Sequence, residues 1–395
     1  MSSAYLARQP ILDRDQSVAG YELVYPQRDA DDAPVDDALS TARVAVTAFS
    51  ELGLENLVGQ SRAWITVTPE FLSQDLARNL PPDRVVLQLG AGAFGERSAL
   101  DVVTELRAAG YQLALDQFRY QPGLEALLQT VDFVKVDMAA FGARELAHQS
   151  FELGPFDVTL VAQKVETPED FRLAKAAGAD LFQGFFFCRP HLVGARAVLP
   201  SRIALMQLAA ALQDPAIQLA DLEQLISADV GLSYRLLTYI NSAFFGLRGR
   251  ISSIKQATAL LGIANLRPWA TLTTMADLGE KPRELFVTAL IRAHFCEQAG
   301  EATDGTPAER FTLGLFSVLD ALTDLSMYTA LQNLPLTPST RDALIHHTGA
   351  GRLLGCVMGI EQGEFDRANE IVDGASQYYL DAVAWSNDKG KQLIG

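Results

Sequence analysis

The sequence predicts two domains of different fold class: an α/β barrel in residues 1–195 and an all-α domain in residues 200–395. Between residues 63 and 187, short apolar runs alternate with amphipathic helical stretches, which is typical of βα units around a buried parallel sheet. From residue 201 onward the strand signal disappears and helical periodicity dominates. The 395 residues suffice for two domains with sizeable cores.

The first domain begins with a predicted hairpin around residues 13–16, formed by Ala4–Ile11 and Val18–Tyr25. The further predicted strands are Ala63–Val67, Arg84–Leu89, Tyr111–Leu115, Val131–Val136, Asp157–Val161 and Leu181–Phe187. Helices are predicted at Asp36–Leu52, Glu70–Arg78, Arg97–Ala109, Pro122–Gln129, Phe141–Ser150 and Pro168–Ala177. This number of units favours a closed (β/α)8-like barrel over an open sheet.

The segment His191–Pro200 changes composition, ends in a proline and is predicted to be the linker. Helices are predicted beyond it at Ile203–Leu212, Leu219–Ala228, Ser233–Ser242, Ile254–Leu261 and Glu284–Glu301, with more toward the C-terminus. The apolar side chains within Asp373–Gly395, among them Tyr379, indicate a last helix that packs back onto the second domain.

Composition excludes several classes of function. The net charge of −16 and the pI of about 4.8 oppose binding to nucleic acid or to anionic membranes. No apolar run approaches the ~18 residues of a membrane-spanning helix, and the N-terminus lacks the features of a signal peptide. The 3 cysteines are far apart, with no CxxC spacing, which indicates reduced thiols. We therefore expect a cytoplasmic protein.

Polar side chains lie at the C-terminal ends of the predicted strands. They are Glu22, Thr66 with Thr68, Gln88, Asp116 with Gln117, Lys135 with Asp137, Gln163 with Glu166, and Gln183. The C-terminal ends of the strands form the chemical face of a (β/α) barrel, so these residues define the candidate site.

Several segments around this ring resemble the EAL family of cyclic di-GMP phosphodiesterases. They are Gln9-Pro10-Ile11, Gly20-Tyr21-Glu22-Leu23, Lys135-Val136-Asp137, Ala162-Gln163-Lys164-Val165-Glu166-Thr167, and Gln183-Gly184-Phe185 followed by Pro190. The resemblance covers residues 1–195 and implies an EAL-type barrel. It also implies two divalent cations, Mg²⁺ or Mn²⁺, that activate water for in-line attack on the phosphodiester.

The resemblance also identifies departures from the family pattern. Three amides stand where the family has acidic ligands: Gln88, Gln117 and Gln163. Thr66 replaces an asparagine, and Pro26 replaces an arginine that grips substrate phosphate. Glu22 and Asp116 alone leave two dications about two charges short, because an amide oxygen is neutral. We therefore expect no metal, no cofactor and no catalysis here.

The retained residues have structural interpretations beside functional ones. Asp116 and Lys135 are equally well an ion pair that helps close the barrel mouth, and Glu22 alternatively caps or pairs with that lysine. Gly184 is expected to allow a close approach of the backbone. The three phenylalanines at 185–187 are expected to belong to the core.

The second half resembles the HDOD family of all-α domains, which are related in fold to HD-type metal phosphohydrolases. The resemblance rests on Asn241-Ser242-Ala243-Phe244-Phe245-Gly246, Ile251-Ser252-Ser253-Ile254-Lys255-Gln256-Ala257, Leu260-Leu261-Gly262 and the run Leu313–Asp320. No His-Asp dipeptide occurs, and His346 and His347 are consecutive, so on a helix they diverge by about 100°. We expect no metal site in this half.

One run in the second half is a candidate binding surface. Phe244, Phe245 and Leu247 lie beside glycines in a predicted turn. If they are buried they join two helices, and if they are exposed they form a patch that binds a partner.

Together these interpretations predict a catalytically inactive signalling protein that acts through protein–protein interaction in cyclic di-GMP-linked regulation. Its expected partners are other signalling proteins, with self-association through the barrel and with cyclic di-GMP binding weak or absent. One alternative is a non-hydrolysing cyclic di-GMP receptor that uses Lys135, Gln183 and Glu22. Another is an active phosphodiesterase with further metal ligands.

Overall fold

The structure is a computed structural model. It describes residues 6–24, 53–67, 71–72, 77, 80–90, 98–190, 208, 211, 214, 216–227, 236, 240, 251, 253–263, 266, 281–300, 305–331, 336 and 338–394. Within these ranges, no helix combines the length and apolar character that a membrane span requires. The residues form two compact units, and each is described by itself.

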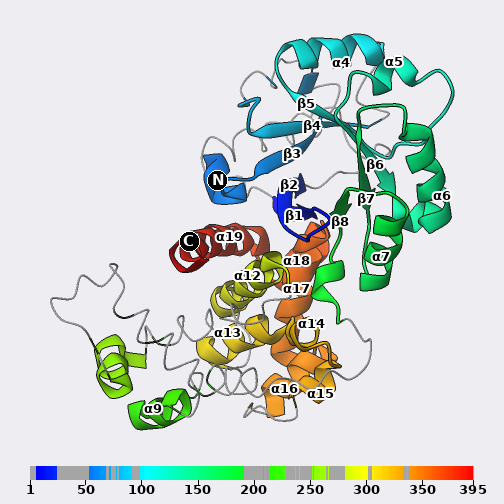
Figure 1. Cartoon of the computed structure of the whole chain (residues 1–395). Helices are drawn as coiled ribbons and strands as arrows, with labels where there is room; N and C mark the ends of the chain where they lie inside the picture. Colours follow the sequence, from blue (N-terminus) through cyan, green and yellow to red (C-terminus); the bar gives the residue numbers. More distant parts are fainter. Residues whose placement is uncertain are drawn as a thin grey trace. The chain divides into compact units, whose positions relative to one another are not determined.

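The first unit contains a closed barrel of eight strands, coloured from blue to green in Figure 1. The strands are β1 (Ala7–Leu12), β2 (Val18–Val24), β3 (Arg62–Val67), β4 (Val85–Leu89), β5 (Gln112–Leu115), β6 (Phe133–Asp137), β7 (Thr159–Gln163) and β8 (Leu181–Gln183). The predicted closed barrel is therefore confirmed.

Strand β1 differs from the others in direction. It is antiparallel to both of its neighbours, β2 and β8, whereas the pairs from β2 to β8 are parallel. The hairpin predicted at the start of the chain is thus part of the barrel wall. It is also the place where the barrel departs from a fully parallel sheet.

Helices follow the strands and lie outside the barrel (Figure 1). They are α2 (Leu54–Val58), α4 (Ala99–Ala108), α5 (Glu125–Leu128), α6 (Met138–Leu153) and α7 (Pro168–Ala176). A capping box begins α7, because Thr167 and Asp170 bond each other's backbone N–H and proline follows the cap. Helix α6 is kinked at Gly142, where φ is 71°.

The prediction was wrong at the end of the last strand. Strand β8 ends at Gln183, and a 3₁₀ turn, η4 (Phe186–Cys188), replaces the expected extension to Phe187. Gly184 has a φ of 147°, a value that side-chain-bearing residues rarely adopt, and this residue turns the chain away from the sheet. The helix predicted at 36–52 lies outside the described residues, as does most of the one predicted at 70–78.

The second unit is helical. Its described elements are α9 (Leu219–Ser227), a helix over 254–263, α13 (Pro307–Phe316), α14 (Leu319–Thr323), α15 (Met327–Leu331), α16 (Pro338–His346) and a 3₁₀ turn, η6 (Gly349–Gly351). One core cluster joins α9 and helix 254–263 through Leu222, Ile226, Ala257 and Leu261. The predicted all-α class of this half is confirmed.

Several helices from the second half of the sequence belong wholly or partly to the first unit. Helix α12 (Arg283–Ala299) contributes residues up to Val287 to the first unit and residues from Thr288 onward to the second. Most of α17 (Arg352–Glu361), together with α18 (Phe365–Ile371) and α19 up to residue 388, belongs to the first unit. The predicted boundary at residues 195–200 lies outside the described residues and stays a prediction.

The last helix, α19 (Ala375–Ile394), was expected to pack onto the helical half. Instead, its residues up to 388 cluster with the barrel. There the buried side chains Tyr379, Leu380 and Val383 face Leu6 and Leu23 of the first hairpin. The apolar stripe identified a buried face correctly, but the sequence did not indicate which surface covers it.

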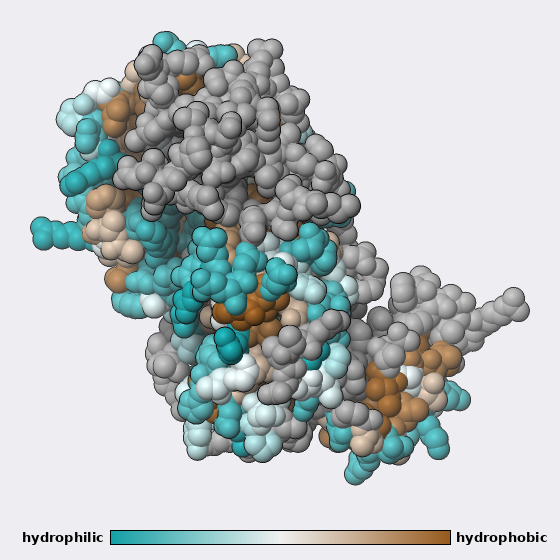
Figure 2. Space-filling model, turned by 180° about the vertical axis from the view of Figure 1, so that it is seen from behind, coloured by the Kyte–Doolittle hydropathy of each residue, from teal (hydrophilic) through white to brown (hydrophobic). Residues whose placement is uncertain are grey.

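On the face shown in Figure 2, the coloured residues are mostly hydrophilic, with local apolar areas. On the face shown, brown residues gather over the segment that includes α9, beside residues drawn in grey. Exposed apolar side chains in that segment include Leu219 and Leu260. Scattered exposed apolar residues are normal for a globular protein.

Candidate functional site

The barrel interior has an apolar floor. It is formed by Ile11, Trp64, Val86, Ala114, Val161 and Leu181, with Phe133 packed against them. The rings of Trp64 and Phe133 lie 4.6 Å apart between centroids. These side chains come from seven different strands, so they fill one layer of the barrel.

A polar layer lies directly above this floor. Side chains alternate between the two faces of a strand, so residues two positions beyond the floor also point inward. Counting two positions toward the mouth from the floor residues gives Thr66, Gln88, Asp116, Lys135, Gln163 and Gln183, and on the antiparallel strand β1 it gives Gln9. Glu22 completes the layer opposite Gln9 in the β1–β2 register.

Glu22 is the centre of a hydrogen-bond network in this layer. Its Oε2 accepts from Lys135 Nζ at 2.8 Å and also from Gln183 Nε2, and its Oε1 accepts from Gln88 Nε2 at 2.9 Å. Lys135 Nζ also donates to Gln88 Oε1. Gln183 Nε2 donates further to Gln9 Oε1 at 2.6 Å. The carboxylate and the ammonium are therefore linked both directly and through one amide.

Burial makes this pair electrostatically strong. The side chain of Lys135 is 0% exposed and that of Glu22 is 14% exposed. Burial by itself raises the pKa of a carboxyl, but the Lys135 ammonium and the three hydrogen bonds together hold the pKa of Glu22 below its ordinary value. The ammonium also lies 5.8 Å from the centroid of the Trp64 ring, so it contacts the floor as a cation–π partner.

Asp116 is held by a different partner. Its Oδ1 accepts from Gln163 Nε2 at 2.9 Å, which joins β5 to β7. The next residue, Gln117, has a φ of 50° and turns the chain at the end of β5. Of the two ion pairs considered from the sequence, the structure therefore contains the one between Lys135 and Glu22, and Asp116 is paired with an amide.

A second carboxylate–ammonium pair lies nearer the mouth. Asp137 ends β6, caps α6 by accepting from Ala140 N at 3.0 Å, and pairs with Lys164 Nζ at 2.7 Å. Burial would raise the pKa of Asp137, but the Lys164 hydrogen bond and the backbone N–H groups lower it overall. Burial raises the pKa of Glu166, opposed by nearby Arg189.

The loop after β8 closes one side of the mouth. A Cβ atom at Gly184 would lie 2.0 Å from the carbonyl oxygen of Val165, so only glycine permits this approach, as predicted. Phe185, Phe186 and Phe187 are 7%, 2% and 5% exposed. They are core residues, which confirms the structural interpretation and leaves them unable to stack on a base.

The structure brings most of the predicted site residues into one mouth, but some lie outside the described residues. These are Thr68, Pro26, Phe244, Phe245 and Leu247. Sequence reasoning had not assigned Gln9 or Lys164 to the site, although both lie within the segments used for the resemblance. The period-2 alternation on β1 was the signal that identifies Gln9.

The arrangement does not fit the two cations that the EAL fold implies. Both oxygens of Glu22 accept hydrogen bonds, and the Lys135 ammonium already compensates its negative charge. Gln183 Oε1 is buried without a partner among the described residues, yet it supplies a neutral oxygen only. Nowhere in the described ranges do three or more His, Cys, Asp or Glu side chains form a metal-binding group.

Comparisons with known proteins divide the chain in two. The EAL domain model matches residues 4–190, and the HDOD domain model matches residues 199–337. The chain is 32% identical over 405 residues, 98% of its own length, to the cyclic di-GMP phosphodiesterase CdgJ of Vibrio cholerae, of which 93% is covered. It is 27% identical to the uncharacterized protein YuxH of Bacillus subtilis, with 97% of this chain and 98% of YuxH covered.

Solved structures also match the chain. A manganese and cyclic di-GMP complex of Klebsiella pneumoniae BlrP1 is 24% identical, covers 47% of this chain and 55% of BlrP1, and has a TM-score of 0.38.

The prediction of a catalytically inactive protein is contradicted by the match to CdgJ, a relative that is named a phosphodiesterase and shares nearly the whole length of both chains. The prediction rested on counting carboxylates at the positions where the family has metal ligands. Such a count tests one arrangement of two cations, and it does not measure whether the mouth binds or turns over a nucleotide.

Proposed function

Because the chain belongs to the EAL–HDOD family of two-domain proteins, we propose that it acts on cyclic di-GMP as a phosphodiesterase. The ligand binds at the barrel mouth, and the activity is hydrolysis of one of its phosphodiester bonds to give the linear dinucleotide. The single observation that carries this proposal is the 32% identity to CdgJ across 98% of the chain.

The charges at the mouth support the binding of a dianion. Cyclic di-GMP carries one negative charge on each of its two phosphodiesters, and an uncompensated row of carboxylates would repel it. Three of the carboxylates have a cation beside them, because Glu22 pairs with Lys135, Asp137 pairs with Lys164, and Arg189 lies near Glu166. The earlier expectation of weak or absent cyclic di-GMP binding is therefore replaced by a proposal of specific binding.

The polar layer also supplies neutral hydrogen-bonding groups. Amides from Gln9 and Gln163 line the barrel at the same height as the more deeply buried amides of Gln88 and Gln183. An amide both donates and accepts, as the polar edge of a guanine or a ribose hydroxyl requires. The buried and unpartnered Oε1 of Gln183 is one acceptor that a ligand or water donor would satisfy.

The role of these residues is to bind and orient the nucleotide. The network around Glu22 holds its members in fixed positions before the ligand arrives, which lowers the entropic cost of binding. Since the donor set does not fit two cations, no catalytic step is assigned to a metal here.

The test uses the purified full chain and cyclic di-GMP. Calorimetry measures binding with EDTA, with Mg²⁺ and with Mn²⁺, and chromatography follows formation of the linear dinucleotide. We expect micromolar or tighter binding, and we expect Asp116→Asn to lower turnover by about 10²-fold or more, because Asp116 belongs to the mouth. The control Glu169→Gln, on the exposed face of α7, should behave as the wild type.

The two measurements distinguish binding of cyclic di-GMP from its hydrolysis. Binding no stronger than about 1 mM in every condition would remove cyclic di-GMP as the ligand. Binding without formation of the linear dinucleotide would remove the phosphodiesterase assignment. Cytoplasmic location, self-association through the barrel and protein signalling partners stay predictions.

A further inference from the structure

A buried polar cluster lies on the outer side of strands β1 and β2, within the first unit. Tyr21 donates its hydroxyl to Glu284 Oε2 at 2.7 Å, and the Arg8 guanidinium lies 4.3 Å from the centroid of the Tyr21 ring. Arg8, Tyr21 and Glu284 are 4%, 7% and 3% exposed. The cluster therefore joins the first hairpin of the chain to the first turn of α12 in a place that water scarcely reaches.

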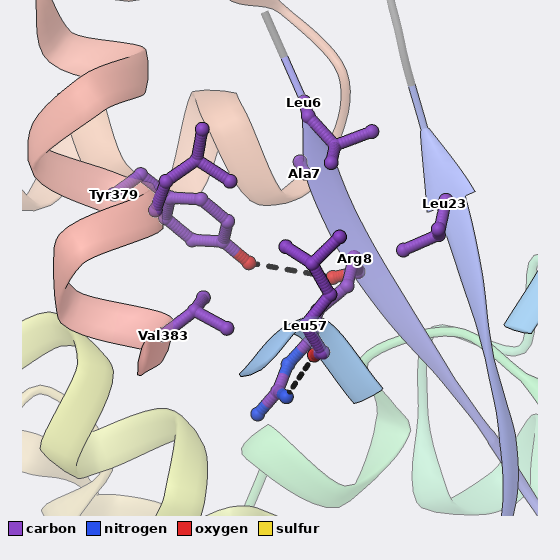
Figure 3. A pocket seen from close by; sticks show the side chains of 8 residues that line it. Leu6, Ala7, Arg8, Leu23, Leu57, Tyr379 and Val383 are labelled. Atoms are coloured by element: carbon purple, nitrogen blue, oxygen red, sulfur yellow. Dashed lines mark hydrogen bonds between the residues drawn. The ribbon is translucent and has the colours of Figure 1, made fainter. Parts of the chain in front are cut away.

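The C-terminal helix completes this cluster (Figure 3). Tyr379 of α19 donates its hydroxyl to the backbone oxygen of Arg8 at 3.4 Å, and Arg8 Nη1 donates to the backbone oxygen of Leu57 at 2.6 Å. The surrounding apolar side chains leave no room for a water molecule. This is a packed joint between elements and offers no cavity for a ligand.

The outer cluster and the inner site share the same two strands. Tyr21 and Glu22 are adjacent on β2, so their side chains point to opposite faces of the barrel wall. Arg8 and Gln9 are adjacent on β1 in the same way, and Gln9 lies opposite Glu22 in the register. A shift of the outer residues therefore moves the inner residues that hold the network at the mouth.

Helix α12 extends from this cluster into the second unit. Its residues up to Val287 cluster with the barrel, and those from Thr288 to Ala299 cluster with the helical unit. Within that part of α12, the backbone of Arg292 and Ala293 lies against Gly314 of α13. Because a continuous helix is stiff along its axis, a displacement of its C-terminal part reaches Glu284.

We propose that Tyr21 and Glu284 are positioning residues for Glu22, through which α12 transmits changes in the helical unit to the cyclic di-GMP site. This inference rests on the proposed function for its ligand. The geometry around Glu22 then depends on the hydrogen bond between Tyr21 and Glu284.

The buried state of Glu284 fits this role. Burial raises the pKa of Glu284, and Arg8 and Tyr21 offset that effect only in part. Two nitrogens of Arg8, Nε and Nη2, have no hydrogen-bond partner among the described residues. The joint is therefore an incompletely satisfied buried polar contact, whose remaining hydrogen bonds are sensitive to the positions of its members.

The first experiment removes one hydroxyl from each of two buried tyrosines. Tyr21→Phe deletes the bond to Glu284 and keeps the ring under Arg8. The matched control Tyr111→Phe deletes a hydroxyl that donates to backbone oxygens of Ala77 and Leu80, away from β2. If Tyr21 only stabilises the fold, both variants should lose similar thermal stability and should affect the cyclic di-GMP site equally.

Two readouts report on the site. One is the Kd and kcat/KM for cyclic di-GMP. The other is the ¹⁹F resonance of 5-fluorotryptophan at Trp64, which lies opposite Glu22 in the β2–β3 register and is assigned by Trp64→Phe. We expect Tyr21→Phe to shift this resonance and to change Kd or kcat/KM by about 3- to 30-fold, whereas Tyr111→Phe changes neither. Glu284→Gln, which keeps an oxygen for Tyr21, should rescue the wild-type behaviour that Glu284→Leu loses.

The second experiment disturbs the helical unit. A Cβ at Gly314 would lie 2.2 Å from the backbone oxygen of Arg292, so Gly314→Ala pushes α13 against α12. The control Gly351→Ala places a Cβ 2.5 Å from the backbone oxygen of Ala343, on α16 in the same unit. We expect Gly314→Ala to shift the Trp64 resonance, and we expect this shift to vanish in the Tyr21→Phe background.

The ¹⁹F readout needs no nucleotide, so it tests the coupling even if cyclic di-GMP is not the ligand. Equal effects of Gly314→Ala and Gly351→Ala at Trp64 would overturn the proposal, as would an effect of Gly314→Ala that persists unchanged in Tyr21→Phe. If Gly314→Ala does not fold, the Tyr21 and Glu284 variants decide alone. Indistinguishable Trp64 spectra for Tyr21→Phe and the wild type would then overturn it.

Discussion

Two buried glutamates contact opposite faces of strand β2, and their pKa values shift in opposite directions. Glu22 accepts hydrogen bonds from the Lys135 ammonium and from two amides, and these partners outweigh burial and lower its pKa. Glu284 accepts from one phenol and has Arg8 nearby, and burial raises its pKa. Both side chains are removed from water, so burial alone does not explain the difference.

The comparison shows that the kind and number of donors decide the state of a buried carboxyl. A direct ammonium contact together with two amide donors compensates the loss of water around Glu22. One neutral hydroxyl and the nearby Arg8 guanidinium do not compensate it around Glu284. The partners of Glu22 therefore favour its charged form, whereas the surroundings of Glu284 favour its protonated form.

The largest expected effect comes from removing the ammonium. Lys135→Met leaves the buried Glu22 carboxylate without its cation, and breaking a buried pair in this way costs about 3–5 kcal/mol. Urea unfolding at pH 7 measures the loss. The reason is that the remaining amides of Gln88 and Gln183 cannot neutralise the charge.

The control for this prediction removes both charges. Glu22→Gln combined with Lys135→Met should recover a large part of the loss, because a neutral amide no longer needs the ammonium. If the double variant is as unstable as Lys135→Met alone, the contrast between the two glutamates has a cause other than charge.

A smaller effect is expected at the amide that links the two charges. Gln88→Leu removes the donor to Glu22 Oε1 and the acceptor for Lys135 Nζ. Each buried group left without its partner costs about 1–3 kcal/mol. Thermal unfolding, compared with the control Gln149→Leu in α6, measures the difference. Gln149 is buried as well, but it accepts a hydrogen bond from a backbone N–H and donates one to the half-buried Glu145. Gln149→Leu should therefore lose less stability than Gln88→Leu.

Much of the barrel was predictable because period-2 alternation and regular helix spacing are local properties of the sequence. The same alternation placed Glu22, Gln88 and Lys135 in one inward-facing layer. The partner of Lys135 was not predictable, because β2 and β6 are not neighbours and their side chains meet across the barrel interior. Which side chains pair across that space depends on their lengths and on the strand stagger.

The outer cluster could not be predicted at all. Tyr21 and Glu284 are 263 positions apart, and nothing local in either segment indicates the other. The apolar stripe of α19 likewise predicted a buried face without its covering surface. Amide-for-carboxylate replacement at Gln88 was visible in the sequence, but its consequence for activity was not.

The outer glutamate should give a pH dependence of the opposite sign from the inner one. The pKa of Glu284 is raised above its ordinary value of 4.5, so the folded state binds more protons above that pH and stability falls as pH rises. Glu284→Gln removes this dependence. Its free energy of unfolding relative to the wild type should therefore increase as pH rises above 4.5, with a slope no steeper than about 1.4 kcal/mol per pH unit.

Glu22→Gln supplies the reverse case. The pKa of Glu22 is lowered from 4.5, so its contribution to stability is present above that value and is lost as pH falls through the folded-state pKa. The difference between Glu22→Gln and the wild type should therefore shrink at acidic pH. Chemical unfolding measured at several pH values checks both signs, and parallel curves for the two variants would contradict the comparison.

The smallest effect is expected at the exposed pair of the mouth. Lys164 and Asp137 lie 2.7 Å apart, about as close as Lys135 and Glu22, but the Lys164 side chain is 64% exposed. Solvent screens this pair, so Lys164→Ala should cost only about 0.2–1 kcal/mol, and the cost should diminish at high salt. Lys164 has a φ of 56°, so Lys164→Gly should be more stable than Lys164→Ala by about 1 kcal/mol, since glycine relieves the left-handed conformation. A loss in Lys164→Ala as large as that of Lys135→Met would mean that distance, and not burial, sets the strength of these pairs.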